Sequence, residues 1–156
     1  MEMWDFRHMG LEPLGVFSTA VTESLLQSHD GVIRVFPARR GDAAFTLYAV
    51  GGTRVTSEQT DGTPCFIALE NPNGGKAHVA NPWETAAAYD RHGELLRGPT
   101  DARTLELDFA ETDAFVLLPG NRNWADLHTA PFTPDRNQEP RRSLSGIAGL
   151  GMPRLF

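Results

Sequence analysis

FTLYAVGGTRVTSEQTDG, residues 45–62, contains two runs in which apolar and polar side chains alternate, 45–50 and 53–59. Alternation with a period of two places successive side chains on opposite faces of a chain, which is typical of a half-buried β-strand. Gly51-Gly52 separates the two runs, and Thr60-Asp61-Gly62 follows the second. Both are turn signals, so the stretch predicts consecutive strands in a β-rich fold.

Similar short runs continue on both sides of this stretch, with Gly, Asn, Asp or Pro between them. Strands at a spacing of roughly 8–12 residues favour an antiparallel β-sandwich, and the absence of helices between them argues against a doubly wound sheet. A weaker hairpin is expected from 86–90 and 94–98, and the last two runs are expected to pair with each other. The other runs are VIRVF (32–36), CFIALE (65–70), KAHVAN (76–81), TLELDF (104–109) and AFVLL (114–118).

Residues 10–29 show a helical pattern instead. Apolar side chains recur there every three or four positions, as a one-sided helix requires, and Pro13 suits its first turn. Asp30-Gly31 is expected to end the helix. The apolar stripe consists of Val16, Phe17, Ala20, Val21 and Leu25.

The last zone has no sustained period. It contains five prolines between 119 and 156, and its few apolar residues cannot offset the entropy of ordering so many residues. We therefore predict a mainly β protein in three parts. An N-terminal segment with one α-helix (1–30) precedes an antiparallel β-sandwich (31–119), and a mostly disordered tail follows (120–156).

Composition excludes several classes. The 156 residues carry a net charge of −6, which argues against nucleic acid as the main partner, and the apolar runs are too short to span a membrane. No secretory signal is visible, so a cytoplasmic location is only the default expectation. The single cysteine, Cys65, excludes an internal disulfide and a thiolate-rich zinc site. The five histidines are scattered, and no cofactor or metal motif is present.

Glu12 is the candidate site residue. It precedes Pro13 at the start of the expected helix, between Leu11 and Leu14. A carboxylate in a first helical turn is commonly explained by the helix dipole, with which it interacts favourably. Carboxylates are also the groups that cleave glycosidic bonds, so a catalytic role stays open.

The run LLQSHDGVIRVFPA, residues 25–38, resembles a specific junction. It is similar to the segment in which the helical barrel of glycoside hydrolase family 95, the inverting α-L-fucosidases and their relatives, passes into the C-terminal β-domain. The resemblance continues more weakly through 45–83, including Asn81-Pro82-Trp83, and through 107–119.

This resemblance implies that the chain is the terminal barrel helix plus the C-terminal β-domain of such an enzyme. The barrel and the second carboxyl group would then lie upstream of Met1, and the chain would support a barrel and be inactive alone. Counting back from Leu25 places Glu12 where the family has an Asp that activates the hydrolytic water, although residues 11 and 13–16 depart from the family's loop. The implied partners are a carbohydrate in the parent enzyme and an upstream barrel chain, or a second copy through the exposed helix.

Two other interpretations remain open. A free-standing carbohydrate-binding module would stack sugars on exposed rings, for which the candidates are Trp4, Tyr48, Trp83, Tyr89 and Trp124. Three or more coplanar exposed rings would favour it. An inert remnant without a present function is the third possibility.

Overall fold

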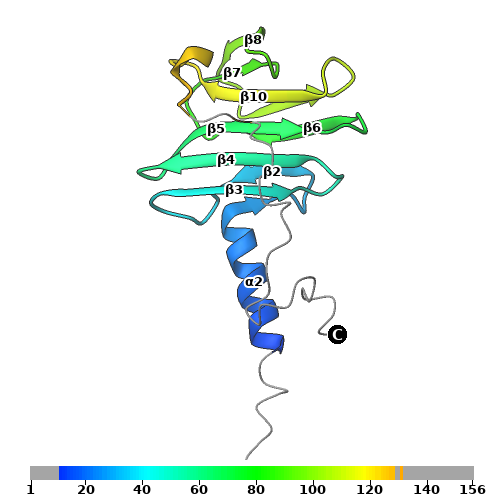
Figure 1. Ribbon diagram of the computed structural model, residues 1–156, viewed down its shortest axis with the longest axis vertical. Helices are drawn as coiled ribbons and strands as arrows, with labels where there is room; N and C mark the ends of the chain where they lie inside the picture. The colour runs from blue at the N-terminus through cyan, green and yellow to red at the C-terminus, as the bar shows by residue number, and fades with distance from the viewer. Residues whose placement is uncertain (1–10, 129–130, 132–156) are drawn as a thin grey trace, which may run out of the picture.

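The computed structural model describes residues 11–128 and 131, with side chains from residue 15 onward. It consists of one α-helix, two facing β-sheets and a short 3₁₀ helix (Figure 1). The mainly β architecture with one preceding helix confirms the fold class expected from the sequence.

The smaller sheet has four strands in the order β1-β2-β6-β9. These strands are β1 (Leu26–Gln27), β2 (Val32–Val35), β6 (Lys76–Ala80) and β9 (Thr104–Asp108). The β2–β6 pair is parallel, whereas β1–β2 and β6–β9 are antiparallel.

The larger sheet has six strands in the order β3-β4-β5-β10-β7-β8, and all of its pairs are antiparallel. The hairpin expected from 86–90 and 94–98 is confirmed as the antiparallel pair β7–β8. The strands are β3 (Ala43–Tyr48), β4 (Arg54–Thr60), β5 (Thr63–Glu70), β7 (Ala86–Tyr89), β8 (Leu95–Thr100) and β10 (Ala114–Pro119).

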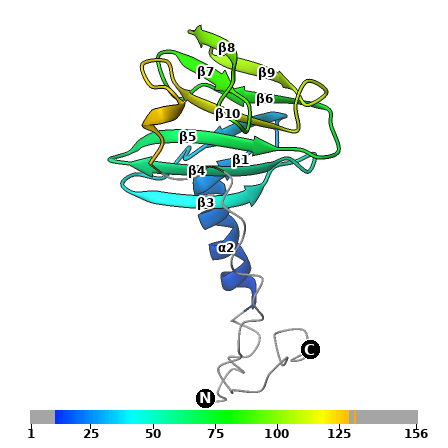
Figure 2. The same cartoon turned by 45° about the horizontal axis from the view of Figure 1, so that its top comes forward.

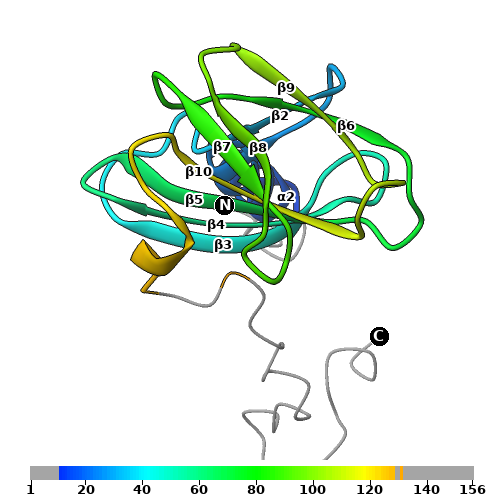
Figure 3. The same cartoon turned by 90° about the horizontal axis from the view of Figure 1, so that it is seen from above.

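The main core lies between the two sheets (Figures 2 and 3). Ile33, Val79 and Leu107 come from the smaller sheet, and Val55 and Phe115 come from the larger one. The side chains of this core occupy alternate positions of their strands. The apolar residues that recur with a period of two in the sequence therefore point toward the core.

The expected pairing of 104–109 with 114–118 is wrong. β9 pairs with β6 in the smaller sheet, while β10 lies between β5 and β7 in the larger one. Leu107 of β9 and Phe115 of β10 are both buried in the core between the sheets. The connection at 109–113 therefore crosses from one sheet to the other, so the two strands belong to opposite sheets.

The helix α2 (Leu11–Leu25) ends earlier than the sequence suggests. Leu26 and Gln27 leave the helix and pair with Val35 and Arg34 as strand β1, which places Leu26 in the core. Gly31 has a φ of 82° and shapes the turn between β1 and β2 instead of ending the helix. Burial of Leu26 favours the strand over another helical turn.

A second, smaller apolar cluster covers the outer face of the larger sheet. Phe66, Val116 and Leu118 are buried there, and the half-buried side chains of Trp124 and Leu127 pack against the cluster. Trp124 belongs to the 3₁₀ helix η1 (Trp124–Asp126). Residues 120–128, expected as the beginning of the disordered tail, thus pack on the sandwich, while most of the remaining tail lies outside the described residues.

Candidate functional site

Glu12 lies near the N-terminal end of α2, as that helix is described, and this end points away from the sheets (Figure 1). Its side chain lies outside the described set. Glu12 precedes Leu25 by 13 positions, which at ~1.5 Å per residue places its backbone ~20 Å from the C-terminal end of the helix. The structure therefore puts the sequence-predicted site residue far from the sandwich.

The described part of the chain offers Glu12 no second carboxylate at catalytic distance. An inverting glycosidase requires two carboxyl groups ~6.5–9.5 Å apart. Glu23, on the same helix, is 11 positions away, or ~16 Å along the axis, and the sandwich begins beyond it. No described residue supplies this second carboxyl group. Sugar hydrolysis by Glu12 would therefore need a carboxyl group from outside the described residues or from another chain.

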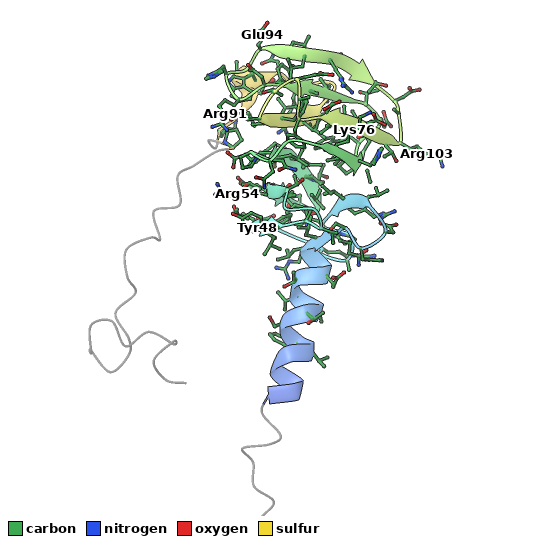
Figure 4. All side chains as sticks on the ribbon, turned by 90° about the vertical axis from the view of Figure 1, so that its right-hand side faces the viewer. Tyr48, Arg54, Lys76, Arg91, Glu94 and Arg103 are labelled. Atoms are coloured by element: carbon green, nitrogen blue, oxygen red, sulfur yellow. The ribbon has the colours of Figure 1, made fainter. Side chains whose placement is uncertain are left out.

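The apolar stripe of α2 is exposed as expected. Val16 and Phe17 are 69% and 68% accessible, and Val21 is 43% accessible, whereas Leu25 is half-buried against the core. On the opposite side of the helix, Gly15, Thr19 and Thr22 are also exposed, and the only charged residue between 15 and 25 is Glu23. The helix thus presents a large, nearly uncharged surface (Figure 4).

The base of α2 is fixed to the sandwich. The backbone N–H of Phe36 donates to the Leu25 carbonyl at 2.6 Å, and that of Ala38 donates to the Ser24 carbonyl at 3.4 Å. These bonds satisfy carbonyls that a helix end leaves without intrahelical partners. Together with the direct passage into β1, they fix the direction in which the helix projects.

Two arginines and two carboxylates form a network of ion pairs on the larger sheet. Glu70 accepts from Arg54 at 3.0 Å and from Arg91 at 3.3 Å, and Arg91 also pairs with Asp113 at 2.9 Å. Tyr48, Arg54 and Arg91 lie on one side of the sandwich (Figure 4). Because these carboxylates are engaged by guanidinium groups, the network indicates cross-strand stabilisation.

The smaller sheet carries a comparable pair. Lys76 donates to Glu106 at 2.6 Å, and this hydrogen bond lowers the pKa of the Glu106 carboxyl and raises that of the Lys76 ammonium. A general acid would need the opposite shift for a carboxyl group. Across the described residues, no three His, Cys, Asp or Glu side chains are grouped as metal ligands.

The aromatic candidates for sugar stacking do not form a shared platform. Tyr48 is 72% exposed, but Tyr89 is buried, and Trp124 is half-buried with its ring centroid 6.2 Å from that of Tyr89. Trp83 is also half-buried, and Trp4 lies outside the described residues. Among the described aromatic candidates, one ring is strongly exposed, whereas the module hypothesis asks for three that are coplanar.

The motif Asn81-Pro82-Trp83 has a local structural role. The Asn81 side-chain oxygen accepts from the Trp83 backbone N–H at 2.9 Å, and the Trp83 indole N–H donates to the Pro64 carbonyl at 2.8 Å. The motif thus ties the β6–β7 connection to the start of β5.

Sequence reasoning missed a hollow of about 560 Å³ at this end of the sandwich. Its walls come from the β4–β5 turn, the β6–β7 connection and the segment after β10, including Asp61, Trp83, Glu84 and Arg122. Each of these segments is an ordinary turn in the sequence. Only the strand pairing brings them together, so no local signal could have identified the hollow.

No helix in the described part of the chain has the length and apolar character that a membrane crossing requires. Comparison with known proteins found no matching family model, no matching curated protein and no matching solved structure.

Proposed function

We propose that this chain is the C-terminal β-domain of a glycoside hydrolase related to family 95, and that it supports a catalytic helical barrel without turning over substrate alone. The observation that carries this proposal is the projecting helix α2. Its base is hydrogen-bonded to the sandwich, while Val16 and Phe17 remain more than two-thirds exposed.

Burial of the stripe would be energetically favourable. Removing a Val or Phe side chain fully from water contributes about 1.5–3 kcal/mol, so Val16, Phe17 and Val21 together supply several kcal/mol to a partner that covers them. A contiguous exposed apolar surface of this kind marks an interaction site. A helical partner fits best, because an apolar stripe at helical spacing packs into the grooves of neighbouring helices.

The proposal also accounts for the position of Glu12. A barrel packed around α2 would surround its N-terminal end with side chains that the sandwich cannot provide. Its carboxylate could then act as the base that activates water, or orient that water, opposite an acid supplied by the barrel. The substrate of the assembled enzyme would be an oligosaccharide or glycan.

The test is reconstitution. The chain is mixed with an α/α-barrel polypeptide from a family 95 enzyme that lacks its own last helix and β-domain, and the mixture is analysed by size-exclusion chromatography with light scattering. We expect a one-to-one complex. Failure to associate at concentrations well above ordinary interface affinities would overturn the proposal, as would efficient release of sugars by the chain alone.

The alternative, a free-standing carbohydrate-binding module, receives less support in its platform form. Tyr89 and Trp124 contribute to the outer apolar cluster, so their rings are engaged in packing. A glycan array on the isolated chain separates the two ideas, because a platform module binds without a barrel.

A further inference from the structure

The hollow beside Trp83 is a preorganised cavity that the supporting role of the domain does not use. Its volume of about 560 Å³ lies within the ~300–1,000 Å³ typical of small-molecule sites. Three separate connections form it, and each is held in place by hydrogen bonds of its own.

Trp83 lines the hollow, and its indole is held in place by a hydrogen bond. Its N–H donates to the Pro64 carbonyl at 2.8 Å, and the half-buried residue packs against the core between the sheets while it also lines the hollow. Pro64, Pro82 and Pro119 also line the hollow and give it further apolar surface. A fixed aromatic ring next to apolar walls suits the C–H faces of a ring-shaped ligand.

The segment after β10 is hydrogen-bonded to the β6–β7 connection. The backbone N–H of Gly120 donates to the Thr85 carbonyl at 2.8 Å. A Cβ at position 120 would lie 2.2 Å from the Thr85 hydroxyl oxygen, so the two connections approach as closely as only glycine permits. The segment that carries Asn121 and Arg122 is therefore held beside Thr85.

Polar side chains also line the hollow and are available to a ligand. Asp61, Glu84, Asn121 and Arg122 are exposed, and their side chains have no hydrogen bond or ion pair with any other described residue. Two carboxylates, one amide and one guanidinium offer acceptors and donors at the same rim. The excess of negative charge disfavours an anionic ligand.

We propose that this hollow binds a neutral saccharide unit, with the sugar ring against Trp83 and its hydroxyl groups hydrogen-bonded to Glu84, Asp61 and Arg122. A ring with apolar C–H faces and an equatorial girdle of hydroxyls matches an aromatic side chain and a mixed polar rim. The site takes one sugar unit in a pocket and does not require the coplanar rings of a platform. It belongs to the sandwich and does not depend on the helical partner.

The test is titration of the ¹⁵N-labelled full chain with two matched pairs of sugars, D-galactose with D-galacturonate and D-glucose with D-glucuronate, followed by amide chemical shifts. A single sugar in an open pocket is expected to bind with a roughly millimolar dissociation constant. We expect at least one neutral sugar to give saturable shifts in the non-proline residues of 60–64, 82–85 and 119–122, and its uronate to bind several-fold more weakly.

The variants Glu84→Gln and Arg122→Gln remove one charged group each from the exposed rim and should leave the fold intact. Each should weaken binding about tenfold, because a hydrogen bond to a charged group is among the stronger ones. Glu94→Gln, an exposed carboxylate in the β7–β8 turn, is the matched control and should bind as the wild type does.

Three results would overturn the proposal. They are the absence of saturable shifts in these segments at tens of millimolar of either neutral sugar, tighter binding of the uronates, and equal affinities of the Glu84→Gln and Glu94→Gln variants. None of these results bears on association through α2, since a variant of the Phe17 face should retain sugar binding.

Discussion

Gly120 links the fold to the hollow beside Trp83. A Cβ at this position would lie 2.2 Å from the Thr85 hydroxyl oxygen and 2.9 Å from the Thr85 Cβ, so Gly120→Ala must push the two connections apart. The backbone hydrogen bond from Gly120 to Thr85 would lengthen with them. We expect the free energy of unfolding, measured by urea denaturation, to fall by about 1–3 kcal/mol, as overpacking typically costs.

Gly98→Ala is the matched control. No heavy atom lies within 4 Å of a Cβ built at Gly98, so this substitution adds a methyl group in open space. It should change the free energy of unfolding by no more than about 1 kcal/mol. Equal destabilisation by the two substitutions would contradict the steric explanation for Gly120.

Asp30 predicts a pH dependence of stability. Its carboxylate accepts from the Arg34 guanidinium at 2.8 Å and from the Val32 backbone N–H at 3.2 Å, and these hydrogen bonds lower its pKa from 3.8 to about 2. A carboxyl group with a depressed folded-state pKa stabilises the fold above its unfolded pKa, and this contribution is lost as the pH falls through the folded value. The stabilising effect of Asp30 should therefore decrease between pH 3.8 and about 2.

The measurement is Tm against pH for the wild type and Asp30→Asn. The two curves should run parallel above about pH 4 and converge as the pH approaches 2, because protonation removes the same charge as the substitution. Asp101→Asn, at an exposed position outside the strands, controls for the change in net charge. A difference between the wild type and Asp30→Asn that persists unchanged at pH 2 would contradict the ion-pair explanation.

The exposed helix α2 predicts the solution behaviour of the isolated chain. The stripe of Val16, Phe17 and Val21 has no described partner, so it should cover itself by association with a second copy. We expect concentration-dependent oligomers in size-exclusion chromatography with light scattering. Phe17→Asp with Val21→Asp should shift the chain to a monomer, because each carboxylate would have to be desolvated in the interface.

Thr19→Asp with Thr22→Asp provides the control on the opposite side of the same helix. It adds the same charge and involves side chains of low helix propensity, but it leaves the apolar stripe intact. The oligomers should persist in this variant. A wild-type chain that is cleanly monomeric at high concentration would show that the exposed stripe does not drive association.

The elements also show where sequence reasoning succeeds and where it stops. Strands β3 and β4 were predictable because each has one face in the core, so the alternation is visible in the sequence. β5 and β10 are buried on both faces, because Trp124 and Leu127 cover the outer side, so they read as continuous apolar runs. Such runs carry no information about which strand lies beside them, and β10 was accordingly paired with the wrong neighbour.

The candidate functional features were likewise predictable only in part. The stripe of α2 could be predicted because helical periodicity is a local property of 15 residues. The hollow beside Trp83 could not, since Asp61, Glu84 and Arg122 lie on three turns that are far apart in the chain. The short strand β1 escaped notice for a related reason, because its two residues are fixed by pairing with β2 and by the burial of Leu26.

The sandwich and the helix differ in how they expose apolar side chains, which the sandwich mostly buries and α2 leaves accessible. The interior between the sheets is mainly apolar, and the carboxyl groups of Asp30, Asp90 and Glu106 have lowered pKa values, which makes them poor proton donors at neutral pH. Under the proposed function, the sandwich supports the barrel, and hydrolysis is expected where α2 meets its partner.

Glu12 is expected to act only in a complex of this chain with the barrel polypeptide. The isolated chain should not hydrolyse glycosides, because Glu12 lies ~20 Å along α2 from the sandwich and an inverting displacement needs a second carboxyl group within ~10 Å. A complex with the barrel polypeptide should be active, and Glu12→Gln should then lower kcat by ~10²–10⁴ while the complex still forms. The amide keeps the shape of the side chain and removes only the ionisable group.

Complex formation and rate must be measured on the same samples, so that a loss of assembly is not mistaken for a loss of chemistry. Glu23→Gln is the control, because it changes the other carboxylate of α2 near the sandwich end. A true base also leaves a mark on the pH profile, since kcat of the wild-type complex should fall at low pH with the protonation of Glu12, and this limb should be absent in Glu12→Gln. If Glu12→Gln retained activity within about threefold of the wild type, a barrier difference under ~1 kcal/mol, Glu12 would be a residue of the first helical turn that only interacts with the helix dipole.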